Sequence, residues 1–395
     1  MSSLADTPRR LAELAQDIRA LGFDHIESFA WRDLDDPDAG GSEVHADHVF
    51  RRISEVGVSV SHRTSCKTSA REFDRNGYHV TQRGSRYGVF PRVILRNIFR
   101  RKRDSSIVVE IWNGVPWFAR LWARGPRVTL MHHIHEDMWR DSLPRTLAPL
   151  GRALEVHIAP PFYKDAPLIT LAHPTREELI SRGFHPDKVH VAHPGIDEAF
   201  FVTRPKGDER LNSPLLVAVG RLAPVKRFDL LIHTFDHLHQ LRPDARLVII
   251  GEGPEEQTLK KLVQDRGLSS SVTLAGRVDR DELIATYRDA ALLVSMSHSE
   301  GWGMTITEAA ASGTPCVVTD NIGHRGAVVD KLTGLLVADD AQFAQTIARV
   351  LGDSAMWGAM SAAALAHSHS FSWDACAEKI LQVIHHEVLR HAADA

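Results

Sequence analysis

The sequence contains little cysteine and no long hydrophobic run. Its three cysteines, Cys66, Cys316 and Cys376, are widely spaced and form no Cys-x-x-Cys pair. This argues against a disulfide framework or a zinc ribbon and is compatible with a reducing compartment. No apolar stretch approaches the ~18 residues of a membrane-spanning helix, and the N-terminal segment lacks the apolar region of a signal peptide. We therefore expect a cytoplasmic protein.

A charge bias towards one sign is also absent. The 47 lysine and arginine residues stand against 50 aspartate and glutamate residues, so the formal net charge is −3. We therefore expect no nucleic-acid partner. The length of 395 residues exceeds what one ordinary hydrophobic core holds, and it predicts two domains.

Short apolar runs alternate with helical patterns along both halves of the chain, which is typical of parallel α/β sheets. The strands expected in the first half are 26–31, 58–61, 107–111, 128–131, 168–171 and 189–192. Those expected in the second half are 215–219, 247–250, 272–274, 291–295, 316–319 and 335–337. We place an N-terminal Rossmann-like domain at 1–200, a linker around 200–214 and a second Rossmann-like domain at 213–370. A dehydrogenase is disfavoured because the nearest Gly-x-Gly-x-x-Gly match, 251–256, lacks the third glycine.

The most informative segment is 300–308, with the sequence Glu-Gly-Trp-Gly-Met-Thr-Ile-Thr-Glu. It follows an expected strand, makes a Gly-x-Gly turn and opens a helix. A helix N-terminus presents unpaired N–H groups and the positive end of a dipole, which suits an anion such as a phosphate. Glu300 lies before the turn and Glu308 inside the helix, so each is placed to accept hydrogen bonds from hydroxyls on either side of that anion.

A second loop carries two cations. Arg221 and Lys226 follow the strand that ends at Gly220, and the glycine allows the backbone to approach a ligand closely. Two cations on one loop can hold a diphosphate through charge-assisted hydrogen bonds. Taken alone, the same residues also fit an ordinary solvated loop.

These two loops resemble motifs of the retaining GT-B glycosyltransferases, in particular glycosyltransferase family 4, also called glycosyltransferase group 1. The resemblance is nearly continuous over 215–337 and thinner over 25–200. It implies two doubly wound Rossmann-like domains that face a cleft, with a C-terminal helix at 375–395 that crosses back to the first domain. It also implies transfer of a hexose-type sugar from a nucleotide-diphosphate sugar, with a UDP-sugar favoured, to an acceptor hydroxyl with retention of configuration.

The resemblance implies roles for individual residues. Arg221 and Lys226 would neutralise the leaving nucleotide without a tightly bound metal or cofactor. Glu308 would accept both ribose hydroxyls, and Glu300 would face the donor sugar. The other positions that the resemblance places on the donor are Gly40, Gly41, Gly220, Val278, Gly303, Met304 and Thr305. Arg227 departs from the family, which usually has glycine after the lysine.

The remaining site predictions concern the first domain. Gly40 and Gly41 precede a helix that Ser42 is expected to cap. The run 131–135 is Met-His-His-Ile-His, and the family has a catalytic histidine at this strand end. Motif position favours His132, with His133 second. A zinc site is disfavoured, because neighbouring residues on a strand rarely converge on one metal, and Asp33-Leu34-Asp35 is interpreted as a solvated loop.

A basic stripe on one expected helix bears on the identity of the acceptor, which the sequence does not determine. The stripe consists of Arg92, Arg96, Arg100, Arg101, Lys102 and Arg103, opposite apolar residues of the same helix. Basic amphipathic helices can lie on anionic membranes, although a solvated helix face explains the pattern as well. The acceptor is therefore a sugar, a lipid or a small molecule, with peripheral membrane contact through 92–103 as an option.

Three other functions fit the same scaffold. A phosphorylase would release the sugar to phosphate, and a nucleotide-sugar epimerase would use no acceptor. A catalytically dead sugar-nucleotide-binding protein is the third, and the presence of both glutamates and both cations argues against it. The oligomeric state is left open.

Overall fold

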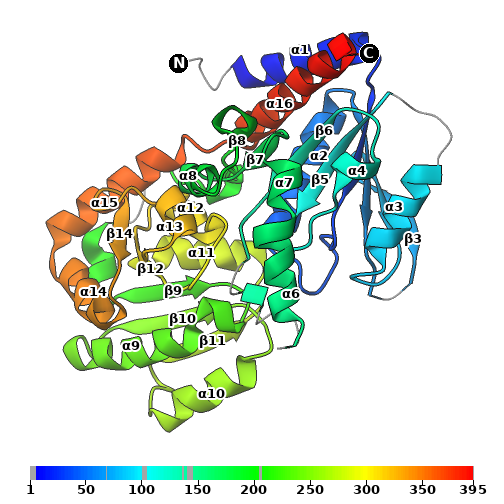
Figure 1. Cartoon of the computed structure of the whole chain (residues 1–395). Coiled ribbons are helices and arrows are strands. Elements are labelled where there is room, and N and C mark those ends of the chain that lie inside the picture. The colour runs from blue at the N-terminus through cyan, green and yellow to red at the C-terminus, as the bar shows by residue number, and fades with distance from the viewer. Residues whose placement is uncertain are drawn as a thin grey trace. The chain divides into compact units, whose positions relative to one another are not determined.

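The structure is a computed structural model that describes residues 6–67, 69–99, 105–135, 138–139, 146–203 and 207–394. The chain forms two compact units, shown in Figure 1. The first consists of Met1–Gly195 and Ser372–Ala395, and the second of Ile196–Phe371. The sequence predicts that the first domain ends at residue 200, that the second begins at 213, and that the C-terminal helix begins at 375.

The first unit is built on an eight-stranded sheet with the order β3-β4-β2-β1-β5-β6-β7-β8. Its strands are β1 (His25–Phe29), β2 (Ser59–Thr64), β3 (Arg71–Arg75), β4 (Tyr78–Gln82), β5 (Ser106–Trp112), β6 (Arg127–Met131), β7 (Leu168–Thr170) and β8 (Val189–Val191). Its described helices are α1 (Thr7–Ala20), α2 (Gly41–Glu55), α3 (Val89–Phe99), α4 (Ala119–Trp122), α6 (Ala148–Ala153), α7 (Pro160–Tyr163), α8 (His173–Ser181) and α16 (Trp373–Asp394), with a π-helical turn at Leu154–Ile158. All strand pairs are parallel except β3 with β4.

The β3–β4 hairpin is an element that the expected strands omit. Its outer strand, Arg-Glu-Phe-Asp-Arg, is too charged to read as a buried strand. The hairpin turns at Asn76 and Gly77, which have φ values of 47° and 87°. Asn-Gly is the preferred pair for the two-residue turn that joins antiparallel strands.

The second unit is built on a six-stranded parallel sheet with the order β11-β10-β9-β12-β13-β14. Its strands are β9 (Leu215–Val219), β10 (Arg246–Ile250), β11 (Val272–Gly276), β12 (Leu292–Ser295), β13 (Cys316–Thr319) and β14 (Gly334–Val337). Its helices are α9 (Phe228–Leu241), α10 (Glu256–Asp265), α11 (Arg280–Asp289), α12 (Met304–Ala311), α13 (Ile322–Ala327), α14 (Phe343–Gly352) and α15 (Ser354–Ser368). All six strands expected from the sequence are confirmed. The strand order reverses between β9 and β12, and in such sheets ligands bind beyond the carboxyl ends of the strands at that point.

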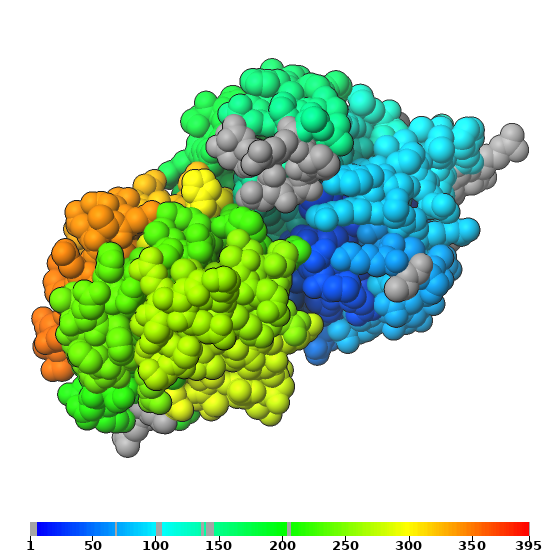
Figure 2. Space-filling view, turned by 90° about the horizontal axis from the view of Figure 1, so that it is seen from below, coloured from blue at the N-terminus to red at the C-terminus, as the bar shows by residue number. Residues whose placement is uncertain are grey.

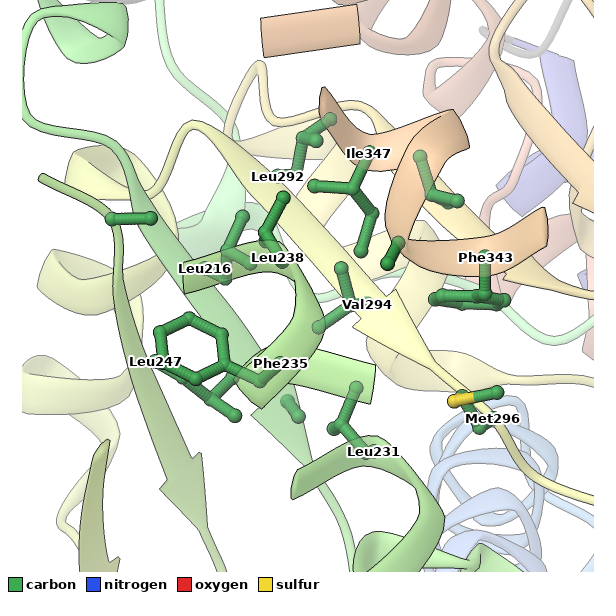
Figure 3. Close-up of a cluster of buried hydrophobic side chains, with 14 of the residues drawn as sticks. Leu216, Leu231, Phe235, Leu238, Leu247, Leu292, Val294, Met296, Phe343 and Ile347 are labelled. Carbon is green, nitrogen blue, oxygen red and sulfur yellow. The ribbon is translucent and has the colours of Figure 1, made fainter. Parts of the chain in front are cut away.

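The core of the second unit lies between the sheet and two of its helices. Phe235 and Leu238 of α9 and Phe343 and Ile347 of α14 converge on β12 (Figure 3), and all four are at most 1% exposed. Burial of each such side chain contributes about 1.5–3 kcal/mol. This core fixes the positions of β9 and β12, whose carboxyl ends carry the two predicted ligand loops.

The C-terminal helix α16 packs against α1 and α2 of the first unit (Figure 1). Arg10 of α1 donates to Glu378 at 2.7 Å, and Arg52 of α2 donates to Asp374 at 2.5 Å. Within the described residues, no helix is both long and apolar enough to cross a bilayer.

The return of the chain to the first unit requires glycine at position 195. A Cβ at Gly195 would clash with the backbone and ring of Trp373, the first residue of α16. We expect Gly195→Ala to lower the free energy of unfolding by about 1–3 kcal/mol, because an overpacked contact must shift the backbone. Thermal unfolding followed by circular dichroism measures this.

Gly358→Ala is the matched control. Gly358 lies in α15, and no atom lies within 4 Å of the position that an alanine Cβ would occupy there. Alanine should therefore stabilise the helix by about 0.5–1 kcal/mol. An unchanged or higher Tm for Gly195→Ala would contradict the expected packing.

Candidate functional site

The junction between β12 and α12 forms the predicted helix N-terminus. Gly303 has φ 99°, a left-handed value that favours glycine, and α12 begins at Met304. The first N–H bond of the helix runs from Ile306 to the Gly303 carbonyl oxygen at 2.9 Å. The N–H groups of Gly303, Met304 and Thr305 therefore precede the hydrogen-bonded turns, as an anion site at a helix start requires.

The structure joins the two predicted loops through Lys226 and Glu300. Lys226 Nζ donates to Glu300 Oε1 at 2.5 Å, and the two side chains are 23% and 17% exposed. A backbone hydrogen bond of 2.9 Å from His298 N–H to the Val225 carbonyl also connects the loops. Burial alone would raise the pKa of Glu300, but the charge of Lys226, helped by His324, brings that pKa below its ordinary value. Glu300 is therefore a carboxylate at neutral pH.

Arg227 shows how the loop accommodates the departure from glycine. It has φ 53° and ψ 41°, so it adopts the left-handed conformation that glycine would adopt more easily. Its guanidinium forms an ion pair with Asp340. A non-glycine residue therefore holds the left-handed conformation at the N-cap of α9.

Glu308 lies in α12, one turn beyond the helix start. The hydroxyl of Tyr287, which is fully buried in α11, donates to Glu308 Oε2 at 3.2 Å. Burial raises the pKa of Glu308 to about 7, against the opposing effects of the Tyr287 hydrogen bond and the Arg280 charge. At neutral pH this carboxyl group is divided between its protonated and ionised forms.

Other residues that the sequence places at the nucleotide-sugar site lie at strand ends of the same sheet. Gly220 and Arg221 follow β9, where the Gly220 N–H donates to the Ile250 carbonyl at 3.0 Å and Arg221 is exposed. Val278 is half-buried beyond the end of β11. Because β10 separates β11 from β9, Val278 lies further along the sheet edge than Arg221.

His324 is a residue near this site that the sequence analysis missed. It is 1% exposed in α13, and its Nδ1 lies 2.6 Å from the Thr319 carbonyl. A Cβ added at Gly303 would contact its ring at 3.6 Å. Burial lowers the pKa of His324, while the nearby Glu300 carboxylate opposes that shift. No motif within 300–308 signals a histidine from the next strand–helix connection.

In the first unit, Gly40 and Gly41 begin α2. Gly40 is extended, and its N–H donates to Glu43 Oε2 at 2.8 Å. The prediction that Ser42 caps the helix is wrong, because the cap position falls at Gly40 and Glu43 supplies the capping oxygen. Ser42 Oγ instead accepts a hydrogen bond from Asn113 at 3.0 Å.

His132, the favoured catalytic histidine, is buried and contacts His45, which in turn contacts Cys376. Its Nε2 lies 3.2 Å from Nδ1 of His45 in α2, and His45 Nε2 lies 3.4 Å from Cys376 Sγ in α16. Burial lowers the pKa of His45 to about 3 and that of His132 well below its ordinary value, so both rings are neutral. His132 Nδ1 is buried and has no hydrogen-bond partner in the described part of the chain. No sequence motif indicates His45, because its contact with His132 spans 87 residues.

Two sequence patterns bear on a metal site, namely the histidines at 132–135 and the segment 33–35. His133 is half-buried with its ring stacked on His135 at 4.3 Å between centroids. Asp33 is 2% exposed and pairs with Arg75 at 2.8 and 2.9 Å, so the interpretation of this segment as a solvated loop is wrong for Asp33. The described residues contain no group of three or more histidine, cysteine, aspartate or glutamate side chains placed to hold a metal ion. Glu136 and Asp137 lie outside the described residues.

Two sequence models of known families match the chain. "Glycosyltransferase Family 4" matches residues 39–200, and "Glycosyl transferases group 1" matches residues 200–367. The chain belongs to the group 1 glycosyltransferases.

Curated relatives of this glycosyltransferase include two described as D-inositol 3-phosphate glycosyltransferase. The Frankia alni protein is 34% identical over 219 residues, which are 51% of this chain and 54% of that protein. The Kribbella flavida protein is 26% identical over 88% of this chain and 92% of its own length. A similar protein from Acidothermus cellulolyticus is matched over 48% of its own length. The chain thus spans about half the length of the Frankia alni and Acidothermus cellulolyticus proteins.

Solved structures identify the fold of this glycosyltransferase as GT-B. Sucrose-phosphate synthase from Thermosynechococcus elongatus superposes with a TM-score of 0.74 at 20% identity, over 91% of this chain and 98% of that one. WaaG, described as a glycosyltransferase of lipopolysaccharide biosynthesis, gives 0.70 at 16% identity over 91% and 99%. HepE of Anabaena, in complex with UDP and glucose, gives 0.67 at 16% identity over 94% and 100%.

The raised pKa of Glu308 predicts a specific pH dependence of stability. Its folded value of about 7 exceeds the ordinary 4.5, so between these pH values the folded protein binds more protons than the unfolded chain. Stability therefore falls as the pH rises through this window, by an amount on the order of 1–3 kcal/mol. Glu308→Gln keeps a neutral acceptor for Tyr287 and removes this penalty.

We expect Glu308→Gln to raise the Tm relative to the wild type at pH 8, and this difference to vanish near pH 5. Thermal unfolding of both proteins from pH 4.5 to 8.5 measures it. Parallel Tm curves for the two proteins across this range would show that Glu308 titrates normally. Glu110, a buried carboxyl whose pKa burial also raises to about 7, is present in both proteins and cancels in the comparison.

Proposed function

We propose that this glycosyltransferase is a retaining hexosyltransferase that uses a nucleotide-diphosphate sugar, with a UDP-sugar favoured, as its donor. The observation that carries the proposal is the Lys226–Glu300 pair beside the N-terminus of α12. It puts a cation, a carboxylate and a set of backbone donors at the switch point of a doubly wound sheet, where ligands bind. The solved structure of HepE with UDP and glucose supports the same class of donor.

The donor diphosphate would lie on the N–H groups of 303–305, with Lys226 and Arg221 supplying positive charge. Lys226 keeps Glu300 ionised, so Glu300 can accept hydrogen bonds from donor-sugar hydroxyls. Glu308 would accept the ribose diol, and the Val278 backbone would meet the base. With cations and a helix terminus on the diphosphate, we propose that no tightly bound metal or cofactor is needed.

In the transfer step, the acceptor hydroxyl would attack the face that the nucleotide leaves, which retains the configuration. The C–O bond to the diphosphate breaks as the bond to the acceptor oxygen forms, and the departing phosphate oxygen takes the acceptor proton. Arg221, Lys226 and the helix terminus stabilise the negative charge that develops on the leaving group. His132 would contact the donor sugar as a neutral imidazole, in keeping with its lowered pKa, and the Gly40–Gly41 loop would border the donor.

The acceptor is proposed only as a class. The relatives described as D-inositol 3-phosphate glycosyltransferases support a phosphorylated polyol, and a sugar, a lipid or another small molecule fits the same reaction. Arg92 and Arg96 lie on α3 beside exposed Leu95 and Phe99, which supports peripheral membrane contact of a cytoplasmic enzyme. The rest of the basic stripe, 100–103, lies outside the described residues.

Thermal shift with a panel of nucleoside diphosphates tests the donor class first. A nucleotide at 100 times its Kd should stabilise the protein by about 2.7 kcal/mol, with uridine diphosphate giving the largest shift. A donor-consumption assay then separates the alternatives, because a phosphorylase needs inorganic phosphate and a dead binding protein consumes no donor. A panel that leaves the Tm unchanged for every nucleoside diphosphate would reject the proposed donor site.

Arg221→Ala tests the charge on the leaving group. One charge-assisted hydrogen bond contributes about 1.5–3 kcal/mol, so we expect kcat to fall about ten- to a hundredfold. The Tm should stay unchanged because Arg221 is exposed. Arg246→Ala, at the amino end of β10, is the matched control and should keep wild-type kcat.

Lys226→Ala should differ from Arg221→Ala in its effect on folding. It leaves the largely buried Glu300 carboxylate without its cation, so it should lower the Tm as well as kcat. Wild-type turnover in Arg221→Ala would contradict the proposed role of Arg221 in stabilising the charge of the leaving group.

A further inference from the structure

A cavity in the first unit is lined by four arginines. It lies between α3 and the β2–β4–β3 part of the sheet and has a volume of about 600 Å³ with its open mouth included. Among the described residues that line it, the arginines are Arg63, Arg83, Arg92 and Arg96, and Glu72 is the one acidic residue. No element of the proposed donor site contributes to it.

The floor of the cavity is a row of side chains across three strands. Arg63 of β2 stands opposite Thr81 of β4, and Thr81 stands opposite Glu72 of β3. Residues in register share one face of a sheet, so the row faces α3. Arg63 is the second-last residue of β2, which places the row at the carboxyl edge, where α/β sheets bind ligands.

Arg63 is buried without a full set of partners. It is 9% exposed, and its one described hydrogen bond is a long one, 3.4 Å from Nη1 to Thr81 Oγ1. Its Nε is buried with no partner among the described residues. Burial, together with the charge of Arg96, lowers the pKa of Arg63 to about 10. An unpaired buried guanidinium is costly to the fold, which favours an anion as its missing partner.

The rim of the cavity adds further positive charge. Arg83, Arg92 and Arg96 are exposed, and within the described part of the chain no carboxylate forms an ion pair with them or with Arg63. Arg92 and Arg96 are four residues apart on α3, a spacing at which like charges repel. Figure 2 shows the segment that contains α3 in cyan, at the surface of the molecule.

We propose that this arginine cavity binds the phosphoryl group of an anionic ligand. Guanidinium forks bind phosphate oxygens in pairs. The described lining carries four arginines and one glutamate, and this excess of positive charge suits a dianion better than a carboxylate. The phosphoryl group belongs either to a soluble phosphate ester or to a phospholipid headgroup at a membrane surface. The proposal rests on the first unit alone, so it does not depend on the proposed donor site.

Calorimetric titration of the full chain with inorganic phosphate, at constant ionic strength, tests the site. Uridine diphosphate is present to fill the donor site, and the titration is repeated with Arg221→Ala, which alters only that site. We expect phosphate to bind both proteins equally. Arg92→Gln/Arg96→Gln should weaken phosphate binding at least tenfold without changing the Tm or nucleotide binding, because both side chains are exposed.

Arg124→Gln, at another exposed arginine of the same unit, is the matched control and should bind phosphate as the wild type does. Arg63→Gln should likewise weaken phosphate binding at least tenfold. If Arg63→Gln fails to fold, Arg92→Gln/Arg96→Gln still tests the cavity. Co-sedimentation with phosphatidylcholine vesicles, with and without phosphatidylglycerol, distinguishes the two sources. Loss of vesicle binding in the double variant, without phosphate binding in solution, assigns the site to a lipid headgroup.

Two results would overturn the proposal. One is phosphate or vesicle binding that is equal in the wild type and the double variant. The other is that the wild type binds neither inorganic phosphate nor anionic vesicles. Because nucleotide binding is measured in the same proteins, failure of the cavity and failure of the donor site give different patterns.

Discussion

The ion pair between Lys226 and Glu300 is the interaction on which the second unit's site depends. It connects the loops that follow β9 and β12, the two strands between which the sheet reverses its order. In the proposed site, Glu300 and the donor diphosphate are both anionic, and the charge of Lys226 reduces the repulsion between them. At an effective dielectric constant of 20, two such charges attract by about 4 kcal/mol at 4 Å. Removing either partner would leave the other partly buried and unpaired.

The two glutamates of the motif have pKa values that shift in opposite directions. Lys226 lowers the pKa of Glu300, whereas Glu308 has a tyrosine hydroxyl instead of a cation and its burial raises its pKa to about 7. Environments that separate the pKa values of neighbouring carboxyl groups are typical of functional sites. Glu300 is thus a fixed carboxylate, while a diol that binds Glu308 must compete with a proton.

Much of the fold could be predicted from the sequence, because in both sheets short apolar strands alternate with helices. The contact between Lys226 and Glu300 could not be predicted, because the alternation of strands and helices does not tell that β9 and β12 are neighbours in the sheet. The burial of Asp33 could not be predicted, because its partner Arg75 lies in a hairpin whose outer strand is too charged to recognise. The contacts of His45 with His132 and Cys376 join segments far apart in the chain, and no local pattern encodes them. The arginine cavity depends on the same hairpin, since two of its three floor strands belong to it.

The stereochemistry of sugar release tests the central proposal of retaining transfer most directly. Proton NMR can record the first anomer formed when the enzyme hydrolyses an α-linked nucleotide-diphosphate sugar, before the free sugar equilibrates in solution. Attack from the face that the nucleotide leaves predicts the α anomer first, with the β anomer growing in only through mutarotation. Initial release of the β anomer would contradict the retaining assignment.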